Sequence, residues 1–153
     1  AVQRLFFLAI AALLLAVVWL SFTQSAASAA TLDVCASGCT YSDIQSAVNA
    51  AANGDTIEVG AGTYAGGMRL SRNVTIRGAG TGLTVLDGGG SGTVLTIDTY
   101  RSGTYNRLNA VIDGLTLANG KTGLVNGRIT TLRDVVVRDN SGRGISISNV
   151  FGS

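Results

Sequence analysis

The chain of 153 residues contains 21 glycines, no proline and no histidine. The lack of histidine excludes a Ser-His-Asp triad, a Cys-His pair and any histidine-ligated metal within these residues. The net charge is only +2, without the clustered basic stripe that nucleic-acid binding requires, so we expect no nucleic-acid partner.

The N-terminus has the layout of a secretory signal. Arg4 precedes an apolar stretch over residues 5–22, and small residues follow as far as Ala30. A basic flank, an apolar core and a small-residue cleavage site predict a signal peptide over residues 1–30, cleaved after Ala29 or Ala30. An uncleaved membrane anchor is the alternative, because the apolar stretch is long enough, and it would be the chain's link to a membrane. We therefore expect a secreted or cell-surface protein.

Two cysteines, Cys35 and Cys39, follow the leader closely. In an exported chain this spacing predicts a local disulfide that stiffens the N-terminal entry. Metal binding is the alternative, but a tetrahedral zinc site would lack ligands, because the sequence has no histidine and no second cysteine pair.

Residues 31–55 are predicted to form an N-terminal cap that contains one helix. Ser42 and Gln45 match the capping-box pattern, and apolar residues recur at helical spacing after them. The turn dipeptide Asn53-Gly54 ends the pattern, which predicts a helix of about three turns. Its apolar face is wide enough to cover the open end of a stacked repeat.

Residues 56–153 form a series of short β-type runs, each closed by glycine, asparagine or aspartate. Since proline is absent, glycine and asparagine are expected to make most turns by adopting left-handed backbone angles. The clearest runs cover residues 56–59, 73–76, 93–97, 111–117 and 132–137.

Two of these runs can be laid over each other, with Ile112 on Leu132, at an offset of about 20 residues that marks a repeat architecture. No helix-length segment separates the runs, so similar strands stacked in register would pair in parallel. We expect an all-β fold, a parallel β-helix of roughly four coils. No polar capping element follows the last coil, which predicts a solenoid truncated at its C-terminus.

Three segments, residues 39–51, 54–64 and 73–78, resemble the N-terminal part of the pectin-lyase-like parallel β-helix proteins. The most specific is the Gly-Asp-Thr-Ile string that begins at Gly54. The resemblance spans roughly residues 35–149 and implies a right-handed parallel β-helix. That superfamily includes pectate lyases, polygalacturonases and pectin esterases, and also β-helix proteins with no known reaction.

Pectate lyases of this superfamily bind calcium through carboxylates on one outer face and use an arginine as the base beside a uronate carboxyl group. The resemblance implies calcium ligation by Asp113 and Asp134, and a catalytic role for Arg138. A strict stack of the repeat would instead pair Asp113 with Arg133, because Asp134 lies one residue further along. The residues around Asp113 also differ from the Trp-Ile-Asp-His string of those lyases.

The leading hypothesis is a non-catalytic extracellular scaffold, without a cofactor, whose long exposed face contacts polysaccharide or other surface glycans. It is motivated by a specific fold pattern without a catalytic set. One alternative is a calcium-dependent, pectate-lyase-like polysaccharide lyase. If the protein is an enzyme, we expect a lyase or glycoside hydrolase acting on a uronate-containing polysaccharide. Another alternative is an inactive gene fragment.

Overall fold

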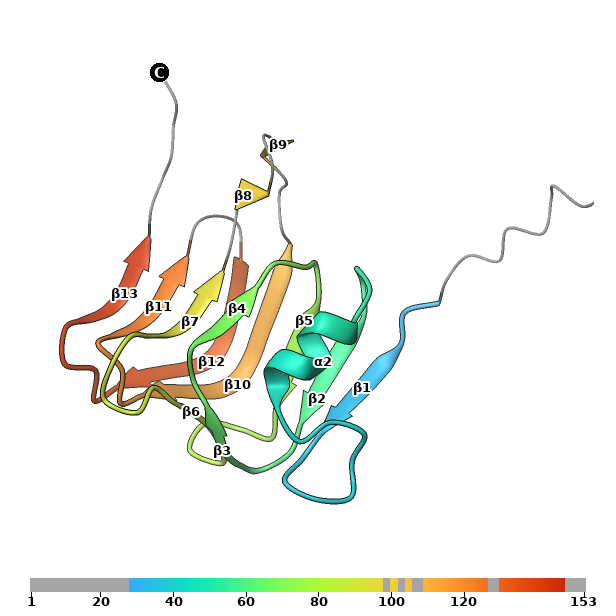
Figure 1. The fold of residues 1–153 in the computed structure, drawn as a ribbon, viewed down its shortest axis with the longest axis horizontal. Coiled ribbons are helices and arrows are strands. Elements are labelled where there is room, and N and C mark those ends of the chain that lie inside the picture. The colour runs from blue at the N-terminus through green and yellow to red at the C-terminus, as the bar shows by residue number, and fades with distance from the viewer. Residues whose placement is uncertain (1–27, 98–99, 102–103, 106–108, 127–129, 148–153) are drawn as a thin grey trace, which may run out of the picture.

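The computed structural model describes residues 28–97, 100–101, 104–105, 109–126 and 130–147. This part of the chain is all-β apart from one short helix, and nearly all of its strand pairs are parallel (Figure 1), so the expected all-β class is confirmed. Within it, no helix is long and apolar enough to cross a bilayer. Nearly all of the predicted leader lies outside the described residues.

The strands are short and follow one another closely. The earlier ones are β1 (Thr31–Val34), β2 (Thr56–Val59), β3 (Gly62–Ala65), β4 (Met68–Leu70), β5 (Thr75–Gly78) and β6 (Thr84–Asp87). The later ones are β7 (Thr93–Ile97), β8 (Tyr100–Arg101), β9 (Thr104–Tyr105), β10 (Ala110–Ala118), β11 (Thr122–Asn126), β12 (Thr130–Arg138) and β13 (Arg143–Ile147). The helix between β1 and β2 is α2 (Ile44–Ala50).

Five strands stack in parallel in the order β1, β2, β5, β10, β12. In the last pair, Ile112 is the Cα partner of Leu132, which confirms the offset deduced from the sequence. A second group consists of β3, β6 and the later halves of β10 and β12, and a third contains β4, β7, β11 and β13.

The two long strands bend at equivalent positions. Gly114 (φ 67°) divides β10 into an earlier half that pairs with β5 and a later half that pairs with β6. Asp134 (φ 45°) occupies the same place in β12. Glycine adopts left-handed angles without steric cost, and aspartate tolerates them better than most residues. Because of these bends, the two halves of one long strand lie in two different stacked groups (Figure 1).

The three stacked groups enclose a single apolar core. Register partners Ile57, Ile76 and Ile112 are each 0% exposed, and Leu86 and Leu117 repeat this stacking in the second group. Fully burying such a side chain stabilises the fold by about 1.5–3 kcal/mol. Alternation along each strand places these residues inside and their neighbours outside.

Helix α2 differs in detail from its prediction. Its N-cap is Asp43, whose carboxylate accepts a hydrogen bond from the Ser46 N–H at 2.8 Å, rather than Ser42. Gln45, expected to complete a capping box, instead accepts from the backbone N–H of Arg69 at 2.8 Å and so links the helix to β4. The helix is 7 residues long, which is shorter than predicted.

Candidate functional site

The outer face of the stack β1-β2-β5-β10-β12 carries two rows of side chains in register, all of them polar except Val111. Because side chains alternate along a strand, the positions on either side of the buried row point outward. The first, here called the threonine row, consists of Thr31, Thr56, Thr75, Val111 and Thr131. The second, here called the charged row, consists of Asp33, Glu58, Arg77, Asp113 and Arg133.

Both rows are open to solvent, since every member is exposed or half-buried. Neighbouring strands in a sheet lie about 4.8 Å apart, so each row presents one side chain at roughly that interval. Along the charged row the Arg77 guanidinium lies 2.8 Å from the Glu58 carboxylate. This exposed ion pair contributes at most about 1 kcal/mol to the stability of the fold.

Three residues were predicted as a calcium and catalytic set, and they occupy different positions in the stack. Asp113 lies in the charged row between Arg77 and Arg133, which are its Cα partners. Asp134 is not in that row but at the bend of β12. No cluster of three or more His, Cys, Asp or Glu side chains able to hold a metal occurs among the described residues. The calcium hypothesis stays a prediction, without the in-register carboxylates that would support it.

Arg138, the predicted base, lies at the end of β12 beyond the bend. Its register partner is Ala118 of β10, and its guanidinium pairs with the carboxylate of Asp139. It therefore belongs to the second stacked group, whereas Asp113 belongs to the first. The structure does not bring these two residues into one constellation.

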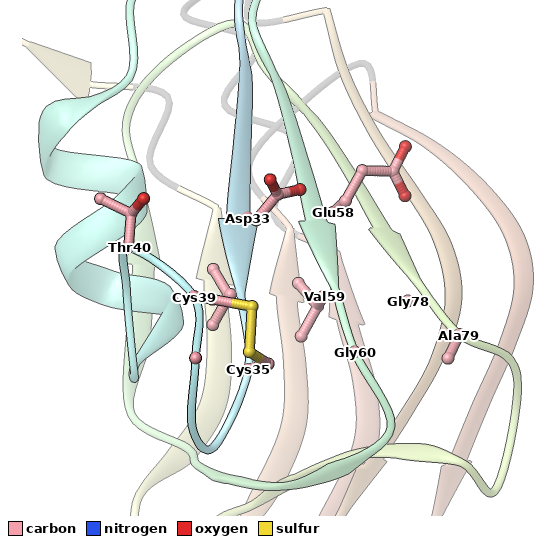
Figure 2. Close-up of a pocket in the computed structure, with 11 residues that line it drawn as sticks. Asp33, Cys35, Cys39, Thr40, Glu58, Val59, Gly60, Gly78 and Ala79 are labelled. Carbon is pink, nitrogen blue, oxygen red and sulfur yellow. A yellow bond between two sulfur atoms is a disulfide. The ribbon is translucent and has the colours of Figure 1, made fainter.

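The disulfide between Cys35 and Cys39 is present, and it closes a short loop after β1. This loop forms part of a cavity of about 470 Å³ at the β1 end of the charged row. Figure 2 shows the disulfide beside Val59 and Gly60, with the carboxylates of Asp33 and Glu58 at one end. The cavity thus continues the outer face, and the disulfide loop makes its wall.

Two carboxylates outside the rows, those of Asp55 and Asp87, accept hydrogen bonds from the backbone and have lowered pKa values. Two backbone N–H groups, those of Ala30 and Ala52, lower the pKa of Asp55. The N–H of Gly89 and the side-chain amide of Asn119 lower the pKa of Asp87. Hydrogen bonds within the fold account for both lowered pKa values.

Sequence reasoning missed Asp33, Glu58 and Arg77, although a signal for them exists. A tripeptide of a β-branched residue, an aliphatic residue and a charged residue recurs once in each stacked strand. Its copies begin at Thr31, Thr56, Thr75, Val111 and Thr131.

Comparisons with known proteins do not assign the chain to a family. No protein-family model matches the chain, and no curated protein matches it.

Proposed function

We propose that this protein is an exported scaffold of the pectin-lyase-like superfamily, folded as a right-handed parallel β-helix, and that its outer face binds an extracellular polysaccharide. The observation that carries the proposal is the pair of in-register rows across five parallel strands. The disulfide supports export, because such bonds persist in oxidising compartments.

The two rows provide groups that match the chemistry of a polysaccharide. Hydroxyl groups of the threonine row both donate and accept hydrogen bonds, and carboxylates and guanidinium groups bind sugar hydroxyls more strongly than neutral groups do. Since both rows repeat at roughly 4.8 Å, a chain of similar sugar units can make the same contact many times. The sum of many weak contacts favours an extended ligand over a small molecule.

The residues beside Asp113 favour a scaffold function over a lyase function. Its neighbours along the row are two arginines, which neutralise a carboxylate rather than assemble a calcium site with it. Two arginines in the row also suit a uronate-containing polysaccharide, whose carboxylates form charge-assisted hydrogen bonds with guanidinium groups.

The test compares matched variants on two faces of the molecule. Arg133→Ala and Thr75→Ala remove an arginine and a threonine from the outer face. Arg143→Ala and Thr96→Ala remove an exposed arginine and a half-buried threonine from the sheet that contains β7 and β13. Binding of polygalacturonate, and of dextran as a neutral probe, is measured by isothermal titration calorimetry.

We expect polygalacturonate to bind the wild-type protein, and each outer-face variant to bind roughly fivefold more weakly, the equivalent of about 1 kcal/mol for a lost hydrogen bond. The controls should bind like wild type. Equal losses on both faces, or no binding of either polysaccharide, would contradict the proposal. Calcium-dependent formation of unsaturated uronate that is lost in Asp113→Ala would favour the lyase instead.

A further inference from the structure

We propose that the leader is cut after Ala29, and that the α-ammonium group created on Ala30 forms an ion pair with the carboxylate of Asp55. This processing site rests on the export that the proposed function includes, and it does not depend on polysaccharide binding.

Among the described residues, Ala30 is the first that is tied to the rest of the fold. Its carbonyl oxygen accepts a hydrogen bond from the Thr56 N–H at 2.9 Å, which extends the pairing of β1 with β2. Its own N–H donates to the carboxylate of Asp55 at 2.8 Å. Ser28 and Ala29, directly before it, are exposed and belong to no strand. The ordered structure therefore starts at the bond between Ala29 and Ala30.

The sequence permits two cuts, and the structure distinguishes their products. Signal peptidases require small residues at the last and third-last positions of the leader. Ala29 and Ala27 meet this requirement for a cut after Ala29. Ala30 and Ser28 meet it for a cut after Ala30. The first cut keeps both hydrogen bonds of Ala30, whereas the second removes them. The contacts of the fold therefore favour the first.

Hydrolysis changes the charge of the nitrogen that faces Asp55. Water adds across the amide bond between Ala29 and Ala30, the Ala29 carboxyl group leaves with the leader, and the Ala30 nitrogen becomes an amine. An α-amine has an ordinary pKa of about 7.7–8.0, so it takes up a proton from solvent at neutral pH. A neutral donor 2.8 Å from the carboxylate thereby becomes a cation. The new contact is stronger than the amide contact that it replaces, because both partners are charged.

Asp55 is suited to receive this cation because no described side chain neutralises it. The ion pairs that join described side chains lie in the charged row and at the end of β12, and none of them includes Asp55. The residue is only 6% exposed, and its second carboxylate oxygen accepts a hydrogen bond from the Ala52 N–H at 2.7 Å, which fixes its orientation. A buried carboxylate is costly unless it is paired. The α-ammonium group supplies the missing partner.

The cut is tested on the full chain with its leader, purified in a mild detergent and incubated with a signal peptidase. Intact mass and N-terminal sequencing of the product should give Ala30 as the first residue. A product that begins at Thr31 or at any other residue would overturn the proposal, and so would a chain that is not cut. An uncut chain would favour the membrane anchor, and it would leave polysaccharide binding by the outer face to its own test.

Acylation of amines tests the ion pair, because Lys121 is the chain's one lysine and, being exposed, serves as an internal reference. An ion pair keeps the α-amine in its protonated, unreactive form. At pH 7 its acylation should be on the order of tenfold slower in wild type than in Asp55→Asn, the effect of one pKa unit. Asp87→Asn, which alters a hydrogen-bonded carboxylate elsewhere in the fold, should react like wild type. Equal rates in all three would overturn the ion pair.

A substitution in the leader measures what Ala30 contributes to the fold. Ala29→Leu places a large residue at the last position of the first cut and leaves the second cut permitted. The product then begins at Thr31 and is otherwise identical to the wild-type product. Its thermal midpoint, followed by circular dichroism, should be on the order of 5 °C lower. Equal midpoints would count against the ion pair, whereas a variant that stays uncut would support Ala29 as the processing site.

Discussion

Asp55 shows how a single carboxylate joins the start of the first strand to the end of helix α2. It is only 6% exposed, and its two oxygens accept hydrogen bonds from the N–H groups of Ala30 at 2.8 Å and Ala52 at 2.7 Å. Both bonds favour the charged form, so they hold the pKa of Asp55 below its ordinary value of 3.8.

The lowered pKa makes this contribution dependent on pH. Because the folded-state pKa lies below the unfolded value, the stabilisation is complete above the unfolded pKa and is lost as the pH falls through the folded one. We expect Asp55→Asn to melt at a lower temperature than wild type at pH 7, and the difference to shrink below about pH 4.

Thermal unfolding followed by circular dichroism between pH 7 and pH 3 measures this effect. Asp33→Asn is the matched control, because Asp33 is exposed and should alter the melting temperature little at any of these pH values. A difference between Asp55→Asn and wild type that stays constant down to pH 3 would show that the charge of Asp55 plays no part.

At the scale of elements, successive turns lie so close together that some glycines have no room for a side chain. A Cβ on Gly88, in the turn after β6, would lie 2.6 Å from the Cα of Gly120, in the turn after β10. The contact is with backbone, which cannot rotate away. Gly88 is therefore required by the approach of two turns, and not by the left-handed angle that the sequence led us to expect at turn glycines.

Gly88→Ala should destabilise the fold by about 1–3 kcal/mol, the usual effect of overpacking. Gly144→Ala is the matched control, because a Cβ there would meet its nearest neighbour, a methyl group of Val137, at 3.9 Å, which is an ordinary van der Waals contact. That variant should stay within about 0.5 kcal/mol of wild type. The free energies of unfolding come from urea titration, and equal values for the two variants would contradict the interpretation.

Some elements could be predicted because their pattern is local. The alignment of Ile112 with Leu132 gave the correct partner of each residue, since β10 and β12 are long enough to show alternation. Strands of three or four residues, such as β4, contain too few positions for a period to appear. The sequence pattern also could not decide whether Ser42 or Asp43 is the N-cap of the helix, because both side chains suit that position.

The candidate site was only partly predictable for a different reason. Asp113 and Arg133 were correctly paired, because the repeat is regular between their strands. The rest of the charged row was missed because the spacing is irregular earlier: Arg77 pairs with Asp113 although β6, β7, β8 and β9 lie between them in the chain. Insertions of this kind change the period of a repeat without changing which strands stack.

In the part of the chain that the structure describes, a helix covers one end of the stack, and no described element covers the other end. Helix α2 buries Ile44, Ala47 and Val48 against the first strands, so the stack is covered there. At β12 and β13 the inward side chains have no further strand over them among the described residues. In a stack where each strand contacts only its neighbours, stability is the sum of local terms. We therefore expect it to decrease towards the open end.

Two substitutions at equivalent positions measure this gradient. Ile112→Ala removes a side chain that is 0% exposed and should cost about 2–5 kcal/mol. Leu132→Ala, its register partner in β12, removes a half-buried side chain and should cost roughly 1 kcal/mol. Both are compared by urea unfolding, and equal losses would contradict the gradient.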